Sequence, residues 1–104
     1  MEEIILTDNI DKKLKKLIEI LYNKNYFAIK ENAQKYVFKI YTFIYTIPNQ
    51  PLHYCINVKY GKYYAIFKIN NNTTYYITYD FENAFYLIKN IFNNHEKEYT
   101  IFIK

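Results

Sequence analysis

The sequence contains two histidines and one cysteine, His53, His95 and Cys55, which are residue types that often bind metal ions or act in nucleophilic and acid–base catalysis. His53 and Cys55 are two residues apart, so they share one face of an extended strand, and a cysteine nucleophile needs such a base nearby. Together with His95 they would supply three zinc ligands, whereas structural zinc sites usually have four ligands and catalytic sites have three plus water. Nothing else in the sequence supports either site. We therefore interpret His53 and Cys55 as ordinary sheet residues.

Other catalytic constellations are missing from the sequence. The chain has no serine for a Ser-His-Asp triad, and its single glycine, Gly61, cannot form a phosphate-binding loop. It has no arginine, the residue that clamps phosphates with two parallel hydrogen bonds. A small ribonuclease toxin could use Lys, Tyr and His95 instead, and this stays the third hypothesis. The first expectation is a protein without enzymatic activity, metal or cofactor.

Length and composition indicate one soluble domain over residues 1–104. No apolar run reaches the roughly 18 residues of a membrane span, and the start of the chain, MEEIILTDN, is acidic where a secretory signal would be basic. With one cysteine, the sequence suggests a reducing cytoplasm. Phe, Tyr, Met, Ile, Asn and Lys make up 67 of the 104 residues, and Gly, Ala, Arg and Pro only seven. AT-rich coding can therefore explain much of the tyrosine excess without selection for binding, and the alternative is that some of the tyrosines are functional.

Residues 8–24 have the spacing of an amphipathic helix that begins at Asp8 as its N-cap. One stripe carries its apolar residues: Ile10, Leu14, Leu17, Ile18 and Leu21. Residues 26–30 and 35–47 are rich in aromatic and β-branched residues, which predicts strands. In residues 35–47 the odd and the even positions are both largely apolar, so both faces of a strand would be apolar. We therefore interpret this segment as a central strand or a homodimer surface. The sequence PNQP at 48–51 then breaks the chain.

Apolar residues alternate on either side of Gly61, which predicts a hairpin of residues 52–60 and 63–69 closed by a Gly61-Lys62 turn. This register pairs Tyr60 with Tyr63, Val58 with Ala65, Ile56 with Phe67 and Tyr54 with Ile69. The stretch NNNT predicts a second turn, and a third strand adds Tyr75, Ile77 and Tyr79 to the same inner face. Tyr64 and Tyr76 then point outward.

Asp80 would cap a second helix, FENAFYLIKNIFNN, and residues 98–104 would form a last strand. At the C-terminus of that helix His95 would be stabilised as a cation by the helix dipole. The predicted fold is α+β. It has a mostly antiparallel sheet of about five to six strands, an N-terminal helix, a second helix before the last strand, and both helices on one sheet face.

Positive charge concentrates in residues 25–79, which carry six lysines and one acidic residue. Lysines beside tyrosines on an open sheet face suit nucleic acid, since rings stack on bases and lysines hold phosphates. The sequence therefore predicts a binding face of Lys59, Tyr64, Lys68 and Tyr76, with a second basic patch of Lys12, Lys13 and Lys16. The alternative is a solvated sheet surface whose lysines discourage aggregation.

In size and composition alone, the chain resembles the accessory proteins of phages and other mobile elements, including anti-CRISPR and other anti-defence inhibitors. This resemblance rests on no motif. It implies a small protein that blocks a host protein or ribonucleoprotein in the host cytoplasm by stoichiometric steric block. The main alternative is an RNA- or single-stranded-DNA-binding module that uses the Lys and Tyr sheet face.

Overall fold

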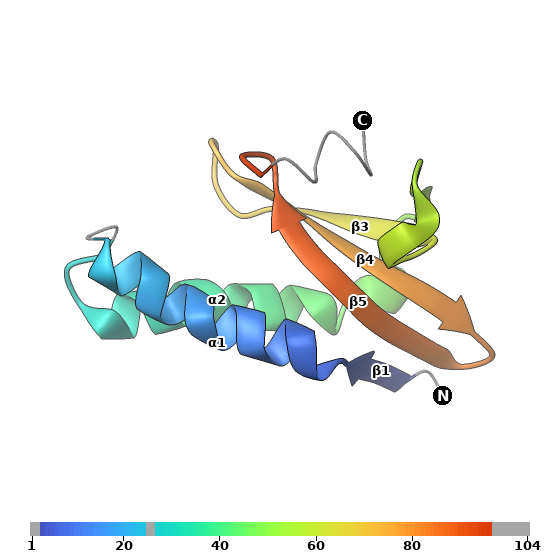
Figure 1. Cartoon of the computed structure of the whole chain (residues 1–104), viewed down its shortest axis with the longest axis horizontal. Coiled ribbons are helices and arrows are strands. Elements are labelled where there is room, and N and C mark those ends of the chain that lie inside the picture. Colours follow the sequence, from blue (N-terminus) through green and yellow to red (C-terminus); the bar gives the residue numbers. More distant parts are fainter. Residues whose placement is uncertain (1–2, 25–26, 97–104) are drawn as a thin grey trace.

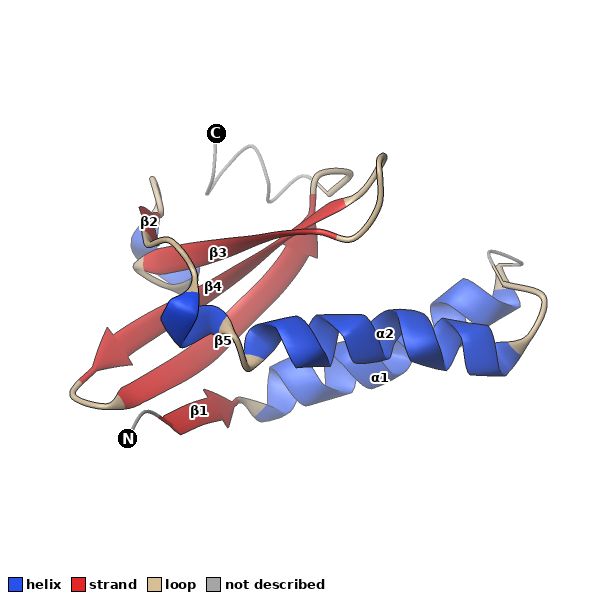
Figure 2. Cartoon of the chain, turned by 180° about the vertical axis from the view of Figure 1, so that it is seen from behind, coloured by secondary structure: helices blue, strands red, loops and turns tan. Residues whose placement is uncertain are grey.

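In the computed structural model, which describes residues 3–24 and 27–96, two helices pack on one face of a mixed sheet (Figures 1 and 2). The order of elements is β1 (Glu3–Leu6), α1 (Asp8–Asn23), α2 (Lys30–Ile44), the 3-10 helix η1 (Ile47–Asn49), β2 (His53–Tyr54), the 3-10 helix η2 (Val58–Tyr60), β3 (Tyr63–Lys68), β4 (Thr74–Glu82) and β5 (Phe85–Asn93). The five strands of the described residues lie in the order β1-β5-β4-β3-β2, with β1 parallel to β5 and the other pairs antiparallel. The predicted α+β class and mostly antiparallel sheet are thus confirmed.

Helix α1 agrees closely with its prediction from apolar spacing. Its buried residues Ile10 and Leu14 come from the predicted stripe. The cap is Thr7 and not Asp8, because the Thr7 hydroxyl accepts a hydrogen bond from the Ile10 backbone nitrogen at 3.4 Å. Before the helix, β1 adds an edge strand that the sequence did not predict.

Helix α2 replaces the strand predicted over residues 35–47, and no strand forms in the described part of 26–30. Its buried residues recur every three or four positions: Ala33, Val37, Ile40 and Ile44. The prediction followed the preference of aromatic and β-branched residues for strands. The four buried residues can face the core together only in a helix, because they recur at helical spacing. Helix α2 packs beside α1 as the second helix of the fold (Figure 2).

The hairpin predicted across Gly61 does not form. Strand β2 has only two residues, and it pairs His53 with Tyr64 and Tyr54 with Tyr63, a different register from the predicted one. The Asn57 side chain accepts a hydrogen bond from the Lys59 backbone nitrogen at 3.0 Å and starts η2, which turns the chain away from a strand. Gly61 ends η2 with a φ of 151°, a conformation that favours glycine.

The β3–β4 hairpin confirms the predicted turn and the predicted faces. Ala65 pairs with Ile77, so Tyr63, Tyr75 and Tyr79 belong to the inner, helix-facing side. The turn is closed by the Asn70 side chain, which accepts hydrogen bonds from the backbone nitrogens of residues 72 and 73 at 2.9 and 2.8 Å. The turn was predicted because asparagine tolerates left-handed backbone angles, but none of the asparagines at 70–72 has a positive φ.

Strand β5 replaces the helix predicted after Asp80, because β4 continues to Glu82 and turns back at Asn83. Asn83 has a φ of 56°, which asparagine tolerates in tight turns. A β-bulge then leaves Lys89 between the pairs Tyr79–Ile88 and Thr78–Asn90. This bulge lets Ile88 and Ile91 share the inner face although they are three residues apart, the spacing that suggested a helix. The strand predicted at 98–104 lies outside the described residues.

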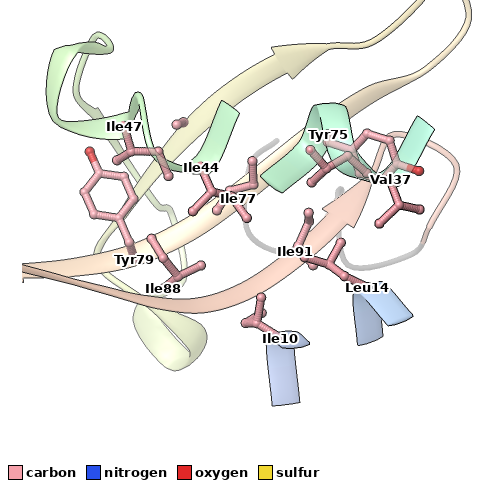
Figure 3. Packing of buried hydrophobic residues seen from close by; sticks show 12 residues of the cluster. Ile10, Leu14, Val37, Ile44, Ile47, Tyr75, Ile77, Tyr79, Ile88 and Ile91 are labelled. Atoms are coloured by element: carbon pink, nitrogen blue, oxygen red, sulfur yellow. The ribbon is translucent and has the colours of Figure 1, made fainter. Parts of the chain in front are cut away.

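The core fills the space between the two helices and the inner sheet face (Figure 3). Helices, η1 and strands all contribute to it, and the fully buried side chains include Ile10, Leu14, Ile40, Ile44, Ile47, Ile77, Tyr79, Ile88 and Ile91. Burying an aliphatic side chain stabilises a fold by about 1.5–3 kcal/mol. These residues therefore hold the scaffold on which the exposed segments are displayed.

Candidate binding surface

His53, Cys55 and His95 have different surroundings in the structure. His53 stacks on the Tyr64 ring with centroids 5.0 Å apart, and Cys55 is buried. Burial raises the pKa of the Cys55 thiol to about 11, and the Asp80 carboxylate adds to this. The thiol is therefore protonated at neutral pH and unsuited to nucleophilic attack. The described residues contain no group of three metal-binding side chains.

His95 does not stabilise a helix end, because a strand precedes it. Its backbone nitrogen donates to the Asn93 side chain at 2.8 Å, and its Nε2 lies 3.4 Å from the Thr73 hydroxyl. These contacts join the end of β5 to the β3–β4 turn. The predicted dipole role is therefore wrong.

Tyr64 and Tyr76 do come together on the outer sheet face, as predicted. Their ring centroids lie 6.0 Å apart, and Tyr76 continues to Phe92 at 6.1 Å. With His53 they form an aromatic row across four strands. Tyr76 is only 9% exposed and Phe92 1%. A ring that stacks on a nucleic-acid base must present its face to solvent, and little of Tyr76 does so.

The predicted lysines occupy three different places. Lys59 lies in η2, while His53 takes the predicted position opposite Tyr64. Lys68 is exposed at the end of β3, opposite Thr74. On α1, Lys12, Lys13 and Lys16 are exposed, and the last two also line a groove beside the sheet.

A surface that the sequence did not predict lies in the β2–η2 segment, defined here as residues 52–60. Four of its apolar side chains are at least half exposed: Leu52 at 50%, Tyr54 at 71%, Ile56 at 67% and Val58 at 62%. They were expected on the buried face of a hairpin. Isolated exposed apolar residues are normal on proteins, whereas four of them within seven residues make this segment a candidate interaction site.

The backbone of the β2–η2 segment is fixed to the sheet by polar contacts. The Cys55 nitrogen donates to the Lys62 carbonyl at 2.9 Å. The buried Thr78 hydroxyl donates to the Tyr60 carbonyl at 3.0 Å, which places η2 over the outer sheet face. The Lys62 nitrogen donates to the Asp80 carboxylate at 2.9 Å. Of the four exposed side chains, Tyr54 also contacts the sheet, because its ring lies edge-on to the Tyr63 ring with centroids 5.4 Å apart.

The charge around this segment is positive. Between Glu31 and Asp80 the sequence contains no acidic residue and five lysines, two of which, Lys59 and Lys62, adjoin the exposed side chains. The Lys59 ammonium lies 5.3 Å from the centre of the Tyr60 ring, a cation–π distance. An acidic surface with apolar side chains is the complement of this composition.

Nothing matches this chain in comparisons with protein-family models, with curated proteins and with solved structures. Within residues 3–24 and 27–96, neither helix is both long and apolar enough to cross a membrane.

Proposed function

We propose that this protein is a non-enzymatic binding protein that covers the surface of another protein through its β2–η2 segment. The observation that carries the proposal is the exposure of Leu52, Tyr54, Ile56 and Val58 on a backbone fixed to the sheet. A preformed apolar surface loses little conformational entropy on binding. Lysines at its edge favour an acidic partner and speed the encounter.

The biological role proposed from composition is inhibition of a host protein or ribonucleoprotein. The small size and AT-rich coding resemble those of phage and mobile-element proteins. Such a protein can inhibit by stoichiometric steric block, because this mechanism requires only that it bind one surface of its target. The β2–η2 segment adds a surface that could make such a contact.

The proposal is tested by capture from a nuclease-treated lysate of the organism in which the protein acts. The tagged wild-type chain should retain one protein in stoichiometric amount. Ile56→Ser should reduce retention at least tenfold, because the partner loses an apolar contact. Ile29→Ser is the matched control, since Ile29 is similarly exposed at 58% but lies at the start of α2. Equal loss in both variants, or in neither, would contradict the surface assignment.

The charge contribution is tested separately with the purified partner. Lys59→Glu should weaken binding and Lys39→Glu, an exposed change on α2, should not. If nucleic acid is retained from an untreated lysate and nothing remains after nuclease, the nucleic-acid hypothesis replaces this one. Its affinity should then fall steeply with salt.

A further inference from the structure

A groove lies between α1 and the ends of the central strands, away from the β2–η2 segment. Two hollows of about 370 and 490 Å³ share the lining residues Leu17, Ile20, Tyr75 and Asn93, so they form one continuous depression. In Figures 1 and 2 the helical pair and the sheet diverge toward the C-terminal end of α1. The α1 residues shared by both hollows, Leu17 and Ile20, lie in this half of the helix. Volumes of this size are typical of small-molecule sites.

The floor of the groove is apolar. Leu17, Ile20 and Leu21 come from α1, and Phe27 and Tyr36 close the far hollow. Tyr36 and Phe27 have ring centroids 5.5 Å apart, so the aromatic wall is packed. The opposite side of the far hollow is polar, since Asn70, Thr73, Asn93 and His95 line it, so it is the α1 side of the groove that suits an aliphatic chain.

The depth of the groove holds one pair of neutral hydroxyls. The Tyr36 and Tyr75 oxygens lie 3.2 Å apart, and either can donate to the other. Burial raises the pKa of the Tyr75 hydroxyl, which is therefore uncharged at neutral pH. Apart from these hydroxyls, the far hollow is lined by one ionisable side chain, His95, and by no lysine, aspartate or glutamate of the described residues.

Positive charge is confined to the mouth. Lys13 donates to the Ile91 carbonyl and lies 3.7 Å from the Glu96 carboxylate, so its charge is already compensated. Lys16 has no ion-pair partner among the residues that the structure describes. One uncompensated ammonium beside an apolar channel matches one monovalent anion attached to an apolar tail.

We propose that the groove binds a single-chain monocarboxylate amphiphile, with its carboxylate at Lys16 and its aliphatic chain along Leu17, Ile20 and Tyr75. This site is independent of the surface proposed above. The apolar side of the groove on α1 selects an apolar tail, and the ammonium of Lys16 selects a carboxylate over a dianionic phosphate.

The test is calorimetric titration of the full chain with decanoate below its micelle concentration. Saturable binding with one site is expected. Lys16→Glu should weaken it at least tenfold, because attraction becomes repulsion, while Lys39→Glu should leave it unchanged. Ile20→Ser should also weaken it several-fold. Ile20 is 37% exposed, so this variant should still fold, as circular dichroism can verify.

Two further ligands make the result decisive. Decanol, which has the same tail without the charge, should bind at least tenfold more weakly than decanoate. No saturable decanoate binding at 1 mM, or equal affinity of wild type and Lys16→Glu, would overturn the proposal. Sedimentation with anionic phosphatidylglycerol vesicles in the absence of decanoate binding would also overturn it, since the groove would then belong to a membrane-surface contact.

Discussion

The β2–η2 segment and the β4–β5 hairpin contain similar residues but use them in opposite ways. In the hairpin, Ile77, Tyr79 and Ile88 are almost completely buried beneath the helices. In the segment, Tyr54, Ile56 and Val58 lie mostly in solvent, while backbone contacts fix their position. Apolar side chains therefore stabilise the fold in one region and stay exposed in the other, where we propose that they contact a partner. Stability and binding should respond separately to substitutions in the two regions.

The largest change in stability should come from alkaline pH, because the hydroxyls of several tyrosines on the helix-covered side of the sheet all lower the free energy of unfolding as the pH rises. Burial raises the pKa of Tyr79 to about 12, and burial together with the hydrogen bond to Asp11 raises that of Tyr41 to about 12. The unfolded chain releases these protons near pH 10, so it holds fewer protons than the folded chain above that pH. The free energy of unfolding should be constant up to about pH 9 and fall between about pH 10 and 12.

Urea unfolding followed by circular dichroism at pH 7, 9, 10.5 and 11.5 measures this effect. Tyr79→Phe should reduce the fall, whereas Tyr54→Phe in the exposed segment should not. An unfolding midpoint that stays the same from pH 9 to 11.5 would contradict the contribution of the buried tyrosines.

The most direct test of the contrast is one substitution made in each region. Ile77→Ala should lower the free energy of unfolding by about 2–5 kcal/mol, because it leaves a cavity in the core. Ile56→Ala should change it by less than about 0.5 kcal/mol, as is usual at exposed positions. Denaturant unfolding of both variants measures the two values. A loss above 1 kcal/mol for Ile56→Ala would mean that the segment contributes to folding.

Gly61 connects the two regions, so its substitution should affect both. A Cβ atom there would lie 3.1 Å from the Thr78 Cβ and 3.1 Å from the Tyr79 nitrogen, on a backbone with a φ of 151°. Gly61→Ala should lower the free energy of unfolding by about 1–3 kcal/mol and weaken partner binding. The neighbouring exposed change Lys62→Ala is the control for thermal unfolding. Equal melting temperatures of the two variants would show that the close approach carries no strain.

The smallest effect is expected at the turn of the β4–β5 hairpin, far from the exposed segment in sequence. Asn83 has a φ of 56°, which glycine and asparagine tolerate better than alanine. Asn83→Ala should cost about 1 kcal/mol, and Asn83→Gly should be nearly neutral. Neither should alter partner binding. Thermal unfolding compares the two, and a destabilising Asn83→Gly would assign the side chain another role.

Local patterns identified some elements well and others poorly. Helix α1 and the β3–β4 hairpin were predicted because their apolar periods, 3.6 and 2, agree with their burial. The prediction failed at α2, where strand-favouring residues fill a helix, and at β5, where a bulge at Lys89 produced helical spacing in a strand. For the candidate binding surface, the sequence predicted Lys59 as a contact, which stays a prediction, and it missed the exposure of the apolar side chains of residues 52–60. The alternation of apolar and polar residues does not show whether a strand is long enough to pair along the whole hairpin and bury its apolar side chains.

By itself, the sequence determined the α+β class, the N-terminal amphipathic helix, the inner and outer faces of β3 and β4, and the basic charge of the central region. These depend on neighbours in the chain and on composition. Tertiary structure decided that residues 30–44 form a helix, that residues 85–93 form a strand, and that the β2–η2 side chains stay exposed. Each of these depends on which distant surface covers the segment, because burial against a partner element outweighs a local preference of a few tenths of a kcal/mol per residue.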